Sequence, residues 1–366
     1  MRTHSAENER IKRDYFTYLK EARRLSEPSI DAAAAAISRF EEYTKYRDFK
    51  YFHIQQAVGF KRKLAEQVSR RTGQRLSKQT LYATLKALRS FFHWLAGRPG
   101  YRSRLSYADA DYFNLSDKET RIAKASSERP VPTVEQILHV LSCMPTETEI
   151  DLRNQALIAL TLLTGARDGA IVSLKLKHLD ITQGKLIQDA REVKTKFSKS
   201  ITNWFFPVPP EVRQIATAWV AFLEKQKLFG PTDPLFPATR VERDKHHLFR
   251  AVGLSRAHWS NATPVRTIFK EAFARAGLPY ANPHSFRNTL AQLGQRVCRT
   301  PEEFKAWSQN LGHEKVLTTF SSYGQITVAR QRDLMRGLAH TPEGTAENER
   351  LVSELLRVLE TSKYGD

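Results

Sequence analysis

Cysteine is scarce in this chain, which has only Cys143 and Cys298 among its 366 residues. The two lie far apart and neither belongs to a C-x-x-C pair, so the sequence excludes a disulfide framework and a thiolate metal site. Long apolar runs are missing as well, because no segment approaches the roughly eighteen apolar residues of a membrane helix. The first residues also lack the apolar core of a signal peptide. We therefore expect a cytoplasmic protein with no membrane partner.

Motifs for nucleotides and metal ions are absent too. No G-x-x-x-x-G-K-[ST] loop occurs, which argues against ATP or GTP as a ligand. Strands and helices do not alternate in the way that a parallel nucleotide-binding sheet requires. The run that contains Asp244, His246 and His247 has no second cluster to complete a metal site, so we interpret it as a polar loop.

Acidic residues are nearly missing from residues 49–104, which hold thirteen Lys or Arg and a single acid, Glu66. The whole chain carries a formal charge of +19 and has a pI of about 9.9. A merely solvated surface would interleave the two signs, so this stretch predicts contact with a nucleic acid. Lys78, Lys86 and Arg89 lie outside the apolar stripe of one predicted helix, which makes them DNA-binding candidates. An ordinary amphipathic helix would give the same local pattern.

Length and periodicity predict a mainly α protein of two domains, since the chain exceeds the ~100–200 residues of an ordinary single core. Serines precede two segments of helical period, Ser29 before 30–46 and Ser77 before 78–96. Short strand-like pieces between residues 179 and 209 predict one small antiparallel sheet in an otherwise helical second domain. The expected boundaries are a helical N-terminal domain at 8–112, a linker at 113–129, an α+β domain at 130–338 and a C-terminal helix or tail at 339–366.

Five residues of the second domain form a set that could cleave a phosphodiester without a metal ion. Arg167 and Arg287 offer guanidinium groups, which neutralise phosphate oxygens bidentately and keep their protons. His284 lies three residues before Arg287, so the two project from one face of a helix. Tyr323 follows His313 by ten residues. A phenol with a pKa near 10 is a weak nucleophile, so it needs the cationic pocket that the other four residues would supply.

The motifs TGAR, HSFR and LGH, followed by a late tyrosine, resemble in this order the tyrosine recombinase (phage integrase) family, over residues 11–338. The resemblance implies that Arg167 and Arg287 hold the scissile phosphate and that His313 hydrogen-bonds it. It also implies that His284 helps to manage the proton of Tyr323. In this family the tyrosine forms a 3′-phosphotyrosine and frees a 5′ hydroxyl, so the resemblance implies no cofactor and no metal.

The resemblance further implies a lysine on a β-hairpin that protonates the departing 5′ oxygen. Lys194, Lys196 and Lys199 surround Thr195 in the predicted hairpin. The family often shows a lysine followed by threonine here, so we choose Lys194 as the general acid, with Lys196 second. Lys196 is also a DNA-binding candidate.

Two positions depart from the family pattern. An acidic residue often stands three positions after the first arginine, but here that position is Ala170, and Asp168 follows the arginine directly. The missing acid would orient its neighbours, so its absence concerns support of the site rather than the reaction. The common spacing from the last histidine to the tyrosine is nine residues, and here it is ten.

The expected activity is therefore that of a site-specific recombinase, the integrase of a mobile element. The expected partners are double-stranded DNA and further copies of the chain, which would form a tetramer on DNA. Accessory DNA-bending proteins are further candidate partners. Such a protein would associate with the nucleoid. A type IB topoisomerase activity and a DNA-binding regulator that has lost catalysis remain as alternatives. The C-terminal helix would dock on a neighbouring subunit or on its own domain.

Overall fold

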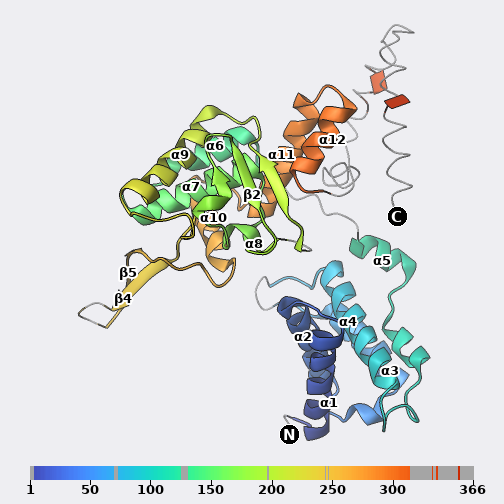
Figure 1. Cartoon of the computed structure of the whole chain (residues 1–366). Helices are drawn as coiled ribbons and strands as arrows, with labels where there is room; N and C mark the ends of the chain where they lie inside the picture. The colour runs from blue at the N-terminus through green and yellow to red at the C-terminus, as the bar shows by residue number, and fades with distance from the viewer. Residues whose placement is uncertain are drawn as a thin grey trace. The chain divides into compact units, whose positions relative to one another are not determined.

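The computed structural model describes residues 4–69, 73–124, 131–195, 198–243, 245, 247–313, 332, 335–336 and 353–354. The chain forms two compact units, residues 1–127 and 128–366 (Figure 1). Tyr323, Lys196 and nearly all of the predicted C-terminal segment 339–366 lie outside the described residues.

The N-terminal unit is helical, as the sequence predicts. Its elements are α1 (Ala6–Thr17), the π-helical turn η1 (Tyr18–Ala22), α2 (Glu27–Tyr43), the 3₁₀ turn η2 (Phe49–Tyr51), α3 (Ile54–Glu66), α4 (Lys78–Ala96), the 3₁₀ turn η3 (Tyr107–Phe113) and α5 (Asp117–Lys124).

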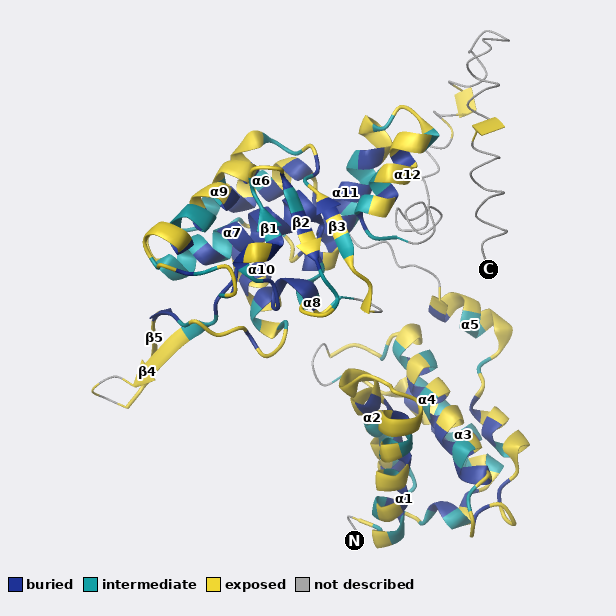
Figure 2. Cartoon of the chain, viewed as in Figure 1, coloured by how far each residue is buried: buried dark blue, intermediate teal, exposed yellow. Residues whose placement is uncertain are grey.

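Helix α4 begins and ends where its sequence indicates. The Ser77 hydroxyl accepts a hydrogen bond from the backbone N–H of Thr80 at 3.1 Å, which caps the helix start. The predicted apolar stripe is buried, and Phe92 lies at its centre, 0% exposed. The ring of Phe92 contacts Phe52 and Phe113 at centroid distances of 4.3 and 5.1 Å. These rings belong to the core of the N-terminal unit, and Figure 2 colours the buried residues of its helices dark blue.

Two element boundaries differ from the prediction. The expected linker contains helix α5, whose start is capped reciprocally, since Ser116 accepts from the Glu119 N–H and the Glu119 carboxylate accepts from the Ser116 N–H. This helix contacts α4, so tertiary packing helps to order a stretch that has few apolar residues of its own. Helix α2 begins at Glu27 rather than after Ser29, because Pro28 fits the first turn of a helix and does not end it.

The second unit combines helices with a small sheet, which confirms the predicted fold class. Its elements are α6 (Val134–Cys143), α7 (Glu149–Thr164), α8 (Asp168–Ile171), η4 (Leu176–His178), β1 (Leu179–Asp180), β2 (Lys185–Gln188), β3 (Ile201–Trp204), α9 (Pro210–Lys225), β4 (Thr239–Arg243), β5 (Phe249–Leu254), α10 (Thr263–Arg275), α11 (Pro283–Val297) and α12 (Pro301–Asn310). Strands β1, β2 and β3 form an antiparallel sheet in that order, with Leu186 opposite Leu179 and Asn203.

Helix α7 is the central element of this unit. Every residue from 156 to 164 is buried, and the helix contacts α6, α9 and α11 (Figures 1 and 2). A helix that is apolar on all sides has to lie inside a core. The C-terminal end of α7 is therefore a rigid support for the residues that follow it.

A second antiparallel pair, β4 and β5, was not predicted. It forms a hairpin that projects from its unit (Figure 1). Its base is held by Arg153, whose guanidinium donates to the carbonyl of Pro237 and to the hydroxyl of Thr239, both at 2.9 Å. Lys245 and His247 lie between the two strands, which agrees with our interpretation of this run as a loop.

Candidate active site

A tight turn after α7 places Arg167. Gly165 ends the helix with a φ of +62°, a left-handed conformation that favours glycine. A Cβ atom at this position would lie 3.1 Å from side-chain carbons of Leu290 and of Leu311, so the tight packing also favours glycine. Arg167 follows in extended conformation and precedes α8. It is half-buried at a helix start, as predicted.

Arg287 lies beneath this turn on α11 and is 3% exposed. Its guanidinium donates hydrogen bonds to the carbonyls of Gly165 and Leu311. One terminal nitrogen also lies 3.1 Å from Nε2 of His313. The Nε atom is buried and has no hydrogen-bond partner within the described part of the chain. Arg287 thus connects three segments that are far apart in the sequence and keeps one donor unused.

The two arginines create a desolvated positive site. Burial, and after it the positive charge of Arg167, lower the pKa of Arg287 to about 9. Burial also lowers the pKa of Arg167. Among the described residues, neither arginine forms an ion pair with a carboxylate. A buried cation without a counter-ion is unfavourable, and an anion that binds both groups would remove that cost. The arrangement therefore fits a phosphate.

The two histidines take different positions. His313 follows α12 and is half-buried, and its Nε2 accepts from Arg287, so the ring hydrogen belongs on Nδ1. His284 is exposed in the first turn of α11, one turn before Arg287. The structure thus brings Arg167, Arg287 and His313 together, and it places His284 on the helix that carries Arg287.

Lys194 is anchored close to the arginine turn. Its backbone N–H donates to the Ser173 hydroxyl at 2.9 Å. Its carbonyl oxygen lies 3.8 Å from the Cβ position of Gly169, two residues after Arg167. The side chain is exposed. Sequence reasoning missed the contribution of Ser173, because a lone serine carries no signal until the fold brings a distant backbone N–H to it.

Asp168 does not replace the missing family acid at Ala170 as a partner of the arginines. Its carboxylate accepts from Nε of Arg266 at 2.8 Å and from the N–H of Gly169. It therefore links α8 to α10. The described residues also contain no group of three or more His, Cys, Asp or Glu side chains that could hold a metal ion.

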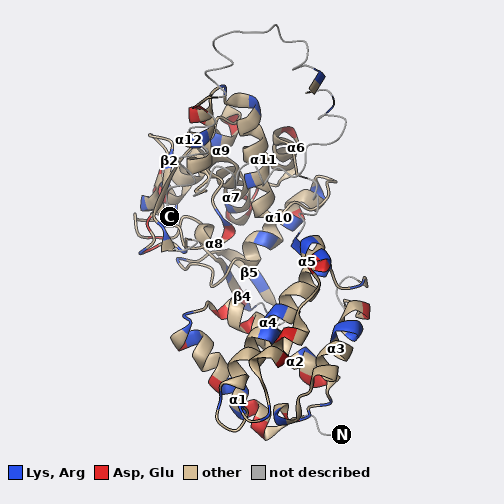
Figure 3. Ribbon diagram, turned by 90° about the vertical axis from the view of Figure 1, so that its right-hand side faces the viewer, with Lys and Arg blue, Asp and Glu red and all other residues tan. Residues whose placement is uncertain are grey.

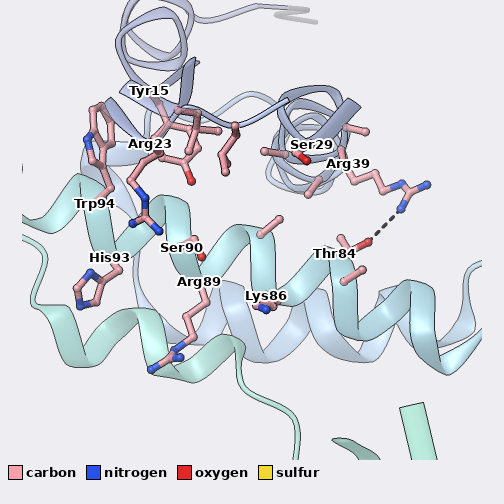
Figure 4. Close-up of a pocket in the computed structure, with 18 of the residues that line it drawn as sticks. Tyr15, Arg23, Ser29, Arg39, Thr84, Lys86, Arg89, Ser90, His93 and Trp94 are labelled. Atoms are coloured by element: carbon pink, nitrogen blue, oxygen red, sulfur yellow. Dashed lines mark hydrogen bonds between the residues drawn. The ribbon is translucent and has the colours of Figure 1, made fainter. Parts of the chain in front are cut away.

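The DNA-binding candidates of the N-terminal unit lie on an exposed face of α4, where Lys78, Lys86 and Arg89 are all accessible (Figure 3). Arg89 also pairs with Asp111 at 2.7 Å, which reduces its free charge. Lys86 and Arg89 line a cavity of about 1020 Å³ between α2 and α4, together with Arg23 and Arg39 (Figure 4). No acidic side chain lines this groove in the described part of the unit.

A run of alanines at residues 32–36 of α2 helps to shape this groove. Ala32, Ala33, Ala35 and Ala36 line the groove from one side, and Ala83 and Ala87 line it from α4. Small side chains on both helices leave the groove open between its basic residues. The groove is therefore both positively charged and accessible.

A comparison with known protein families shows the family of the chain. Residues 112–330 match the model of the phage integrase family, which is more than half of the chain. The chain belongs to the phage integrase family. The expected class of enzyme, a site-specific tyrosine recombinase, is thereby confirmed.

Relatives within the phage integrase family are distant. The tyrosine recombinase XerC of Lactobacillus delbrueckii subsp. bulgaricus is 23% identical over 266 residues, which cover 69% of this chain and 77% of the relative. The XerC protein of Stutzerimonas stutzeri is 22% identical over 316 residues, which cover 83% of this chain and 88% of the relative.

Solved structures of integrases share the fold. A lambda integrase dimer bound to a COC′ core site matches with a TM-score of 0.58 at 13% identity, covering 87% of this chain and 99% of that one. The Tn1549 transposon integrase in complex with a circular intermediate DNA matches with a TM-score of 0.55 at 15% identity, covering 89% and 98%. In the part of the chain that the structure describes, no helix is long and apolar enough to span a membrane.

Proposed function

We propose that this chain cleaves and rejoins DNA at specific sites through a 3′-phosphotyrosine on Tyr323, as the integrase of a mobile element. One observation carries the proposal: among the described residues, Arg167 and Arg287 form a desolvated pair of cations without a carboxylate partner, and Arg287 retains a buried donor without a partner. An arginine that binds a substrate phosphate has to keep a donor available for it, and the unused Nε of Arg287 meets this requirement.

The residues divide the reaction between them. Arg167, Arg287 and His313 stabilise the charge on the nonbridging oxygens, and His284 accepts the proton of Tyr323. The phenolic oxygen attacks phosphorus while the bond to the 5′ oxygen breaks, and Lys194 protonates that oxygen. Lys196 remains the second candidate for this acid. The 5′ hydroxyl of another strand then reverses the step, and the ester conserves the bond energy.

The groove between α2 and α4 would hold DNA. Its lining combines Lys86, Arg23 and Arg39 with small side chains, and it lacks acids among the described residues. Cations of this kind bind phosphates by displacing counterions. The lambda integrase was solved as a dimer on a core site and as a tetramer on a Holliday junction. We propose by analogy that this chain also forms a tetramer on DNA, associates with the nucleoid and works with accessory DNA-bending proteins.

Trapping of a covalent complex tests the proposal. DNA that flanks the gene would first be footprinted with the protein, and the protected site would then be nicked a few nucleotides downstream of the scissile phosphate, so that the short fragment with the free 5′ hydroxyl diffuses away. We expect an adduct that survives denaturing electrophoresis and forms equally well in excess chelator. Specific binding without an adduct would instead favour a regulator that has lost catalysis. Relaxation of supercoils without strand exchange would favour a topoisomerase.

Lys86→Glu should weaken DNA binding broadly and flatten its dependence on salt. Each lost phosphate contact lowers the slope of log affinity against log salt by roughly 0.9. Arg13→Glu on α1 is the matched control, because it makes the same charge change at an exposed residue that does not line the groove. Titrations at several salt concentrations would measure both slopes. Equal slopes for the two variants would contradict a role of the groove in DNA binding.

A further inference from the structure

Residues 192–194, the segment that carries Lys194, are held in place by several contacts of the Glu192 side chain. The carboxylate of Glu192 accepts from Nζ of Lys177 at 2.7 Å and from Nζ of Lys175 at 3.2 Å. It also lies 3.2 Å from Nε2 of His178. All three partners belong to the segment that begins at Lys175 and ends with η4, whereas Glu192 lies two residues before Lys194.

The tautomer of His178 determines the direction of its hydrogen bond with Glu192. It is 4% exposed, and its Nδ1 accepts the backbone N–H of Lys175 at 3.0 Å. The ring hydrogen therefore belongs on Nε2, which donates to Glu192. Burial lowers the pKa of His178, so the ring stays neutral and keeps this tautomer near pH 7. Hydrogen bonds from Lys177 and Lys175 lower the pKa of Glu192 to about 2, so the carboxylate stays ionised.

Residues 192–194 are fixed at two further points. Val193, between Glu192 and Lys194, is 2% exposed and belongs to the core. The backbone N–H of Lys194 donates to Ser173, whose hydroxyl donates in turn to the carbonyl of Ala170 at 2.9 Å. The chain thus passes from the Glu192 cluster, through a buried residue, to the segment that follows Arg167. Lys194 follows the buried Val193, and its side chain is exposed although its backbone is fixed.

We propose that Glu192 is a positioning residue that, through its contacts with Lys175, Lys177 and His178, holds Lys194 in place as the general acid. The inference rests on the proposed function and deepens it by choosing Lys194 over Lys196. Because Glu192 engages the ammonium groups of Lys175 and Lys177, it also keeps these lysines away from the leaving group. Lys194 gives its proton to the 5′ oxygen as the bond from phosphorus to that oxygen breaks, and it regains the proton in the reverse step.

A substrate with sulfur in place of the bridging 5′ oxygen separates positioning from folding. A thiolate leaves without protonation, so cleavage of this substrate does not need the general acid. For Glu192→Gln we expect cleavage of the oxygen substrate to fall on the order of 10-fold or more, because a small misplacement of a catalytic group is costly. Cleavage of the sulfur substrate should stay within about twofold of wild type.

The ratio of the two rates within one preparation does not depend on the fraction of folded protein. Ser173→Ala should shift this ratio in the same direction, because it releases the backbone of Lys194. Glu149→Gln is the matched control: like Glu192, Glu149 pairs with a lysine, here Lys227, and its carboxylate in addition accepts the backbone N–H of Leu254. Its loss should lower stability and leave the ratio unchanged.

Each outcome decides the inference. Selective loss on the oxygen substrate supports it. Equal loss on both substrates would show a merely structural contact, and an unchanged rate on both would show no role, so either result overturns it. If the wild-type protein forms the adduct and Glu192→Gln cleaves both substrates at the wild-type rate, this inference is wrong and the proposed function stands. A wild-type protein that forms no adduct on either substrate removes the proposed function as well.

Discussion

Tyr323→Phe is expected to abolish the covalent protein–DNA adduct while DNA binding stays at the wild-type level. Phenylalanine keeps the ring and removes only the oxygen that would attack phosphorus, so no ester can form. The arginines, which we propose to bind the phosphate, would remain in place. Denaturing electrophoresis of the nicked substrate would measure the adduct, and a gel-shift assay would measure binding. Mass spectrometry of the peptide attached to DNA should identify Tyr323.

Tyr280→Phe is the control for this experiment. Tyr280 also lies in the second unit, four residues before His284, and it is 50% exposed. Burial raises its pKa, which makes it a poorer nucleophile than a free phenol. The control should form the adduct normally. An adduct that persists in Tyr323→Phe and disappears in Tyr280→Phe would move the nucleophile and overturn the assignment.

Arg167→Ala and Arg287→Ala should each reduce the rate of cleavage by roughly 10²–10³, since a preorganised donor to developing charge is worth about 3–4 kcal/mol. The structure separates the two in a second measurement. Arg287 satisfies the buried carbonyls of Gly165 and Leu311, and each carbonyl left without a partner costs about 1–3 kcal/mol. Arg287→Ala should therefore also lower the free energy of unfolding, whereas Arg167→Ala should change it little.

Arg256→Ala is a matched control for Arg287. Arg256 also donates to two backbone carbonyls, those of Lys227 and Leu228, and pairs with Asp233 at 3.3 Å, but it is exposed. Its loss should leave cleavage at the wild-type rate. Single-turnover cleavage and denaturant unfolding would give both quantities. A cleavage defect in Arg287→Ala no larger than that of Arg256→Ala would contradict its contact with the phosphate.

Helix caps and the spacing of apolar residues were sufficient to predict much of the fold. The cap at Ser77 and the apolar stripe through Phe92 predicted α4, because both signals act within a few residues of one another. Helix α5, which lies inside the expected linker, was not predicted, since it has few apolar residues and packs against α4. The hairpin of β4 and β5 was missed for a similar reason. Its base is held by Arg153, which lies far away in the sequence.

The sequence by itself determined which residue types are available for the reaction and in which order they occur. Charge bias and motif spacing pointed to DNA and to Arg167, Arg287 and His313, because residue type sets what a side chain can bind or protonate. Only the tertiary structure decided that these three meet, since Arg287 reaches the turn at Gly165 and the residue His313 through contacts between distant segments. It also decided that Ser173 accepts the backbone N–H of Lys194 and that Glu192 meets Lys175, Lys177 and His178. Such contacts depend on the packing of α7 and α11, which no local pattern records.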